Sequence, residues 1–290
     1  MINIVLGVLG VLTLWFAVVF ISDFMKHKDD LETHNSWGKV TFIGFVVNFF
    51  DTLGIGSFAP ATALLKGMKQ IQDRLLPGTL NVSCTIPVVL ESFIFITVIE
   101  MEPTTLVSML AAATIGAYVG AGIVSKLPEK KVQLVMGVAL FITALLMLAG
   151  QMNWMPGGGE AIGLHGSKLI IAVIANFILG ALMTAGIGLY APCMALVYLL
   201  GMSPKVAFPI MMGSCAFLMP VASSKFVKEK AYDRRASMGI TIGGVIGVLI
   251  AAYLVKSLPL NILKWLVIFV IFYTSATMLK SASKNKEIVS

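Results

Sequence analysis

Charged residues are scarce in this sequence, and their scarcity excludes an ordinary soluble domain. They make up 12% of the chain, against 58% hydrophobic residues, and the mean hydropathy is +0.94. A soluble globular domain carries about twice that share of charge. The hydrophobic residues come in runs that could span a bilayer, which takes about 20 residues each. Function therefore has to reside within the membrane or in short loops.

The sequence also lacks the residue patterns of a metalloenzyme or a nucleophilic enzyme. All three histidines lie in loops, and no HExxH or other paired metal-ligand spacing occurs. The three cysteines fall inside apolar runs, so they form neither a disulfide framework nor a metal site. A serine nucleophile would lack a base at membrane depth. We therefore expect no enzymatic activity, no bound metal and no cofactor.

Apolar runs fill nearly the whole chain. They cover residues 4–22, 40–65, 78–99, 104–125, 132–150, 168–200, 205–224, 236–255 and 261–279. The first run has no basic residue before it and no small-residue cleavage site after it. We expect it to be a retained helix and not a removable signal peptide.

Two of the runs, 40–65 and 168–200, are interrupted at their centres. Residues 52–60 read TLGIGSFAP and residues 184–192 read TAGIGLYAP. Gly-x-Gly with a proline four residues later disfavours a continuous helix. Both runs are therefore predicted to break at these nonapeptides, which agree at six of their nine positions.

Further matches at the same spacing indicate an internal repeat. They are Phe45 with Phe177, Pro77 with Pro209, Ser83-Cys84 with Ser214-Cys215, Gly116 with Gly247, Leu127-Pro128 with Leu258-Pro259, and Met147-Leu148 with Met278-Leu279. One near-constant offset of 131–132 residues through both halves is the signature of a repeat. The first helix is the one element without a counterpart.

The distribution of basic residues predicts how the two copies are oriented. If all nine runs cross the membrane, 12 of the 21 basic residues lie on the inner side. If the two interrupted runs are re-entrant, the inner side holds 17 of them: Lys26, Lys28, Lys39, Lys66, Lys69, Arg74, Lys126, Lys130, Lys131, Lys225, Lys228, Lys230, Arg234, Arg235, Lys280, Lys284 and Lys286. The outer side keeps Lys168, Lys205, Lys256 and Lys264. Cytoplasmic loops are rich in Lys and Arg, so the re-entrant arrangement is favoured.

The predicted fold is an all-α polytopic membrane protein with seven crossings and two re-entrant broken helices. Each half then contains three crossings, and an odd number forces an inverted-topology repeat. The predicted parts are an N-terminal helix and cytoplasmic loop (1–39), a first repeat (40–150), an extracellular linker (151–167), a second, inverted repeat (168–280) and a cytoplasmic tail (281–290). We expect a plasma-membrane protein with its N-terminus outside and its C-terminus in the cytoplasm.

Inverted repeats build secondary transporters, in which discontinuous helices hold the substrate near the midplane. Here the two tips would present half-helix N-termini, whose free N–H groups and positive dipole ends attract anions. Pro60 and Pro192 suit the first turn of such half-helices, and Ser57 is a candidate cap. No Lys or Arg lies at the centre of a crossing. The candidate anion-binding residues are therefore Thr52, Gly54, Gly56, Ser57, Asn81, Ser83, Thr184, Gly186, Gly188 and Ser214. Close helix packing is the alternative role for each small residue taken alone.

Two acidic residues fall within apolar runs and are candidates for proton coupling. Glu91 lies near the middle of run 78–99, and Asp51 directly precedes the first tip. A structural hydrogen bond is the alternative for Glu91. Asp51 would repel an anion unless it is protonated or points away, and its counterpart is Met183, so its role is not symmetric.

The two Gly-x-Gly segments, followed by Gly201-Met202-Ser203-Pro204-Lys205-Val206-Ala207, resemble the sulfite exporter TauE/SafE family over residues 40–280. That family often has three successive glycines, where this chain has Ser57 and Leu189. The resemblance implies a four-plus-four repeat transporter of sulfite, organosulfonates or related sulfur anions.

The expected function is export of such an anion across the bilayer. An anion channel, a carrier of another small anion, a structural subunit and an intramembrane enzyme are the alternatives. The expected partners are lipid and substrate, with a homodimer left open and nucleic acid excluded.

Overall fold

The computed structural model describes residues 2–95, 100–155, 158–254 and 260–284, and all its regular elements there are helical. The helices are α1 (Ile2–Lys26), α2 (Trp37–Thr52), α3 (Phe58–Gly67), the 3-10 helix η1 (Asp73–Leu75), α4 (Leu76–Phe95), α5 (Pro103–Val124), α6 (Glu129–Gln151), α7 (Gly166–Met183), α8 (Tyr190–Leu199), α9 (Pro204–Lys228), α10 (Arg234–Leu254) and α11 (Leu260–Lys284). Lys256, Lys286, the repeat match Leu258-Pro259 and residues 156–157 of the predicted linker lie outside the described residues.

Among the described residues, seven helices are long and apolar enough to cross a membrane: α1, α5, α6, α7, α9, α10 and α11. The predicted all-helical membrane class is thereby confirmed. The set differs in one member from the seven crossings predicted above. It includes α7, which belongs to an interrupted run, and it omits α4, whose hydropathy is lowered by polar side chains such as Asn81 and Glu91.

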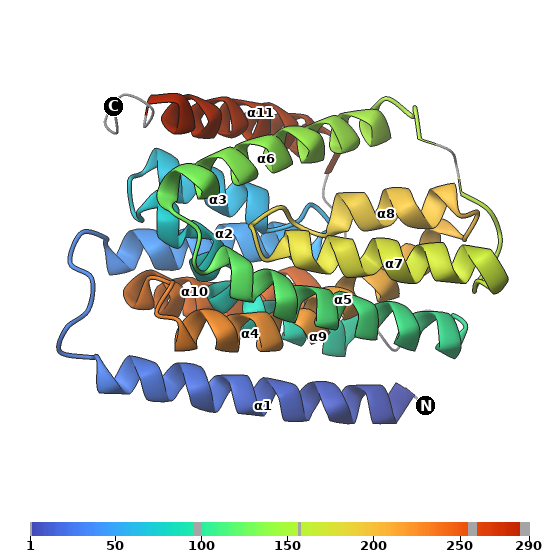
Figure 1. The fold of residues 1–290 in the computed structure, drawn as a ribbon, viewed down its shortest axis with the longest axis horizontal. Coiled ribbons are helices and arrows are strands. Elements are labelled where there is room, and N and C mark those ends of the chain that lie inside the picture. Colours follow the sequence, from blue (N-terminus) through green and yellow to red (C-terminus); the bar gives the residue numbers. More distant parts are fainter. Residues whose placement is uncertain (1, 96–99, 156–157, 255–259, 285–290) are drawn as a thin grey trace.

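Both interrupted runs form helix hairpins. The chain leaves α2 at Thr52 and returns as α3, which packs against α2, and it leaves α7 at Met183 and returns as α8, which packs against α7. In Figure 1, the α2–α3 hairpin extends from one end of the molecule and the α7–α8 hairpin from the opposite end. The helix breaks therefore lie where the glycine and proline pattern predicts them, and equivalent hairpins point in opposite directions.

The two halves pack crosswise, through residues that the repeat had matched. Helix α2 of the first half packs on α10 of the second, and α7 of the second half packs on α5 of the first. A Cβ atom at Gly247 would collide with the carbonyl oxygen of Phe45, and one at Gly116 would collide with that of Phe177. Each glycine thus lets two helix backbones approach closely. Because Phe45 matches Phe177 and Gly116 matches Gly247, exchanging the halves reproduces the same contact.

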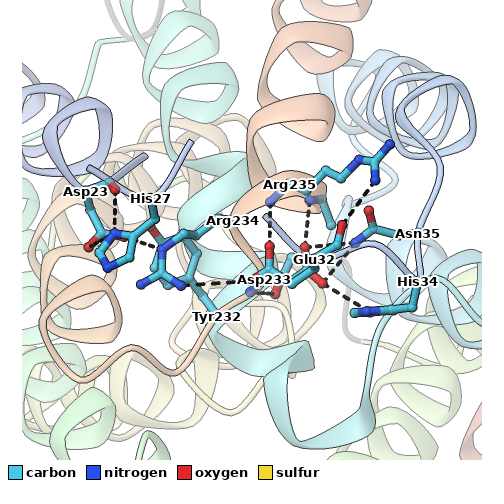
Figure 2. A network of polar contacts seen from close by, with 11 residues as sticks. Asp23, His27, Glu32, His34, Asn35, Tyr232, Asp233, Arg234 and Arg235 are labelled. Atoms are coloured by element: carbon cyan, nitrogen blue, oxygen red, sulfur yellow. Dashed lines mark hydrogen bonds and ion pairs between the residues drawn. The ribbon is translucent and has the colours of Figure 1, made fainter. Parts of the chain in front are cut away.

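Helix α1 stands at the edge of the bundle and is held by polar contacts at its C-terminal end (Figures 1 and 2). The side chain of Asp23 accepts hydrogen bonds from Tyr232 Oη at 2.6 Å and from Arg234 Nε at 2.8 Å. Tyr232 lies in the turn between α9 and α10, and Arg234 is the first residue of α10. This contact attaches the unpaired helix to the second half of the chain.

A second acid in the same turn is fully buried. Asp233 accepts two hydrogen bonds of 2.9 Å from Asn35 Nδ2 and one of 2.8 Å from the backbone N–H of Ala236 (Figure 2). His34 Nε2 lies 3.3 Å from the carboxylate. Burial raises the pKa of Asp233 to about 6, with a smaller contribution from the charge of Glu32. The loop before α2 and the start of α10 are therefore joined through one titratable group.

Candidate binding site between the two helix breaks

The two hairpin tips meet around a small cavity of about 40 Å³. Its wall is formed by residue 51 and residues 55–59 of the first break, residue 183 and residues 187–191 of the second, and side chains of α4, α6 and α9: Val88, Thr143, Met147 and Cys215. The tips touch, since a Cβ atom at Gly188 would lie 3.7 Å from that of Phe58. One water needs about 10–15 Å³ by this measure, so the cavity offers room for about three.

Each tip ends at the start of a short helix. Helix α3 begins at Phe58 and α8 at Tyr190, and both residues line the cavity. The first N–H groups of a helix have no partner within it, and they carry the positive end of its dipole. Pro60 and Pro192 occupy the third position of the two helices, as the sequence indicates for a first turn. The cavity therefore lies at two equivalent, electropositive helix starts.

Ser57 occupies the N-cap position of α3, but its predicted capping role is wrong. Its side chain makes no capping hydrogen bond, and its backbone is already helical, with φ −86° and ψ −35°. Its hydroxyl and its backbone N–H donate instead to the carboxylate of Asp51. Ser57 thus orients an acid in the cavity wall and leaves the other N–H groups of the first turn uncapped by side chains.

The four glycines of the two tips adopt backbone conformations that other residues rarely reach. Their φ angles are +86° at Gly54, +90° at Gly56, +92° at Gly186 and +74° at Gly188. Gly56 and Gly188 line the cavity. Gly54 lines a second, larger cavity, while Gly186 faces Met136. Equivalent positive φ values in both tips explain why the repeat keeps glycine at these positions.

Glu91 connects the two tips from behind the cavity. It is fully buried on α4. Its Oε1 accepts a hydrogen bond of 2.8 Å from Thr52 Oγ1, and Tyr190 Oη donates to its Oε2 at 3.4 Å. Thr52 ends α2 and Tyr190 begins α8. Among the described residues, neither Glu91 nor Asp51 forms an ion pair with a basic side chain.

The structure places the ten predicted binding residues in two groups. Gly56, Ser57 and Gly188 line the tip cavity, and Gly54 lines the larger one. The remaining six residues do not appear in either wall: Thr52, Asn81, Ser83, Thr184, Gly186 and Ser214. Of the two acidic candidates, Asp51 is in the wall of the tip cavity and Glu91 is behind it.

Two of the polar residues outside the cavity walls, Asn81 and Ser214, form hydrogen bonds within and between helices. Asn81 Nδ2 donates to the carbonyl oxygens of Pro77 at 2.8 Å and Thr184 at 3.3 Å. Ser214 Oγ accepts a hydrogen bond of 3.0 Å from Asn176. Their contacts are those of helix packing, which is the alternative role considered for single small residues.

Sequence reasoning missed several residues that complete the wall. Tyr190 carries a phenol into it, Thr143 donates a hydrogen bond of 3.2 Å to the carbonyl of Ile187, and Cys215 borders it from α9. Tyr190 carried a usable signal, because it matches Phe58 in the repeated nonapeptide. Thr143 had none, because it is a single threonine in a run that is otherwise apolar except for Gln133.

This arrangement defines a polytopic, all-helical membrane protein with a small cavity at its paired helix breaks. The chain belongs to the sulfite exporter TauE/SafE family, whose sequence profile matches residues 2–147 and 169–289. The match confirms the resemblance found in the sequence and extends it to the first helix. The family comprises membrane transporters of sulfite and related sulfur anions. No curated protein and no solved structure matches the chain.

Proposed function

We propose that this chain is a secondary transporter that exports a small sulfur-containing anion, sulfite or an organosulfonate, across the plasma membrane. The observation that carries the proposal is the meeting of two equivalent helix starts, at Phe58 and Tyr190, around one cavity. Helix N-termini supply fixed N–H donors and positive potential without a basic side chain. Because no basic side chain is involved, such a site would bind a small anion weakly enough to release it again, and a carrier requires that release.

The hairpins support alternating access in an inverted repeat. We infer that α2–α3 enters the membrane from the cytoplasm and that α7–α8 enters from the outside, so that their tips meet near the midplane. A helix of ten residues, the length of α3 and α8, spans about 15 Å, roughly half of the hydrocarbon thickness. Irregular backbone at that depth is tolerated where it lines a cavity.

The two acids support proton coupling. A charged Asp51 in the cavity wall would repel the anion, so binding is favoured when Asp51 carries a proton. Glu91 contacts both tips, and a change in its protonation alters the hydrogen bonds that join them. We infer that the anion and at least one proton occupy the site together. The two acids occur in the first half only, because Asp51 corresponds to Met183 and Glu91 to Ala222 in the repeat.

A ligand panel tests the substrate class. Purified protein in detergent is heated with sulfite, thiosulfate, sulfoacetate, isethionate, taurine or chloride at equal ionic strength. We expect at least one sulfur oxyanion to raise the melting temperature in a saturable way, while chloride and zwitterionic taurine leave it unchanged. The sulfur assignment fails if no sulfur compound stabilises the protein, and a carrier of another anion is then sought with a wider panel.

A further inference from the structure

A second, larger cavity adjoins the tip site. It measures about 350 Å³ and lies between α6, α8 and α11. Four residues line both cavities: Ile55, Met147, Tyr190 and Ala191. The two cavities are therefore neighbours at the hairpin tips. The remaining wall reaches the C-terminal end of α6 and the loop that follows it, through Gln151, Asn153 and Met155.

The charge of this cavity has one sign. Lys264 on α11 is the one basic residue among its lining residues, and they include no aspartate or glutamate. No ion pair joins Lys264 to an acid within the described ranges. A cavity with low-dielectric walls and charge of one sign raises the local concentration of the opposite ion. The cavity is thus electrostatically suited to an anion, before that anion reaches the uncharged donors at the tips.

The positions that match this cavity in the repeat carry polar side chains bonded to each other. The counterpart of Lys264 is Gln133, which is 3% exposed and donates to Asp73 at 2.9 Å and to Glu129 at 3.1 Å. The counterpart of Tyr198 is Lys66, which forms an ion pair with Asp73. A cluster of bonded polar side chains thus stands where the larger cavity has Lys264 and Tyr198 in its wall.

Apolar wall positions show the same contrast. Met147 and Met194 line the open cavity, whereas their counterparts, Met278 and Thr62, are fully buried. Met147 and Met194 are therefore less deeply buried than the residues that match them in the repeat. This is the asymmetry that an alternating-access carrier shows in one of its two end states.

We propose that this cavity, the Lys264 antechamber, is a second anion-binding site through which the substrate exchanges with the solution on the side of Lys264. The structure is the state open to that side and closed by the Gln133–Asp73–Lys66 cluster on the other. The inference rests on the proposed transport function for the identity of the anion and for its exchange through the cavity. The electrostatic role of Lys264 is testable without transport.

The test introduces one cysteine, Met194→Cys, into the antechamber wall; the native cysteines are buried. Two methanethiosulfonate reagents of similar size are compared, one carrying a sulfonate and one a trimethylammonium group. We expect Lys264→Gln to lower the ratio of anionic to cationic labelling rate by about three- to tenfold at low salt. Lys264→Arg should keep the ratio, and 1 M salt should abolish the difference.

The matched control is Lys205→Gln, which removes an exposed lysine at the N-terminal end of α9 and should leave the ratio unchanged. An unchanged labelling ratio in Lys264→Gln, or an equal change in Lys205→Gln, overturns the proposal of an anion-binding antechamber.

In proteoliposomes, Lys264→Gln should raise the half-saturating anion concentration about three- to tenfold without changing the maximal rate. Absence of any saturable uptake by the unaltered protein refutes the proposed function, while the labelling ratio still decides the role of Lys264.

Discussion

Thr52 donates a hydrogen bond of 2.8 Å to the buried carboxylate of Glu91, and thereby ties the end of a broken helix to an acid inside the membrane protein. The same carboxylate accepts from Tyr190 in the second hairpin. Both tips therefore depend on one group whose charge can change. A proton-coupled carrier needs a link of this kind between the protonation of a buried acid and the position of its gates.

Replacement of Glu91 by glutamine separates coupling from transport. The amide keeps the shape of the side chain and an oxygen acceptor for Thr52, but it cannot exchange a proton. We expect Glu91→Gln to abolish the acceleration of anion uptake by an imposed pH gradient, while exchange of labelled for unlabelled anion persists at a third or more of its original rate. Proteoliposomes with and without a pH gradient provide the measurement. A response to the gradient equal to that of the unaltered protein assigns Glu91 a structural role.

Alanine at Gly56 or Gly188 should weaken anion binding through backbone strain. The φ angles of +90° and +74° cost a non-glycine residue about 1–3 kcal/mol, and neither position has a neighbour that would clash with the new methyl group. We expect a lower melting temperature and at least a tenfold weaker apparent affinity. The control is Gly38→Ala in α2, where φ is helical and no atom lies within 4 Å. Equal affinities in all three variants would contradict the placement of the site.

Cysteine labelling tests the re-entrant hairpins. Single cysteines replace Lys39 and Met68 at the two ends of α2–α3, and Ser167 and Leu199 at the two ends of α7–α8; all four positions are exposed. We expect a membrane-impermeant maleimide to label intact cells at positions 167 and 199 only, with 39 and 68 becoming reactive after permeabilisation. Opposite accessibility of the two ends of one hairpin would show that it crosses the membrane.

Asp233 should make stability depend on pH. Its pKa, raised by burial to about 6, exceeds the ordinary value of 3.8, so the folded protein binds more protons than the unfolded chain between these values. Stability should therefore fall as the pH rises from about 4 to 6, by at most about 3 kcal/mol. Asp233→Asn retains a side-chain cap for α10 and should flatten this slope. Thermal unfolding in detergent at several pH values measures it, and an unchanged slope would assign the dependence to other groups.

The sequence predicted the helix breaks because their cause is local. Glycine and proline disfavour a continuous helix wherever the chain places them, and the resulting turns require the positive φ values seen at Gly54 and Gly186. The repeat offset also predicted a spatial relationship, since Phe45 meets Gly247 as Phe177 meets Gly116.

Side-chain direction could not be predicted in the same way. Ser83 and Ser214 match in the repeat, yet neither appears in the wall of the tip cavity, because the rotation of a helix about its axis depends on packing from several neighbours. The same limit applies to Glu91, whose partners Thr52 and Tyr190 are 39 and 99 residues away. Helix α4 is less apolar than the other long helices because it carries polar residues such as Asn81, which are hydrogen-bonded within the protein, whereas α7 is apolar over its 18 residues before the break.

Counterflow most directly tests the central claim that the paired tips form the substrate site of a carrier. Proteoliposomes loaded with unlabelled sulfite, or with the best ligand of the panel, are diluted into labelled anion. The account predicts that the internal anion accelerates uptake of the label, and that Gly56→Ala combined with Gly188→Ala removes this acceleration while Gly38→Ala preserves it. Uptake that is indifferent to internal anion, or acceleration that survives in the double variant, would contradict it.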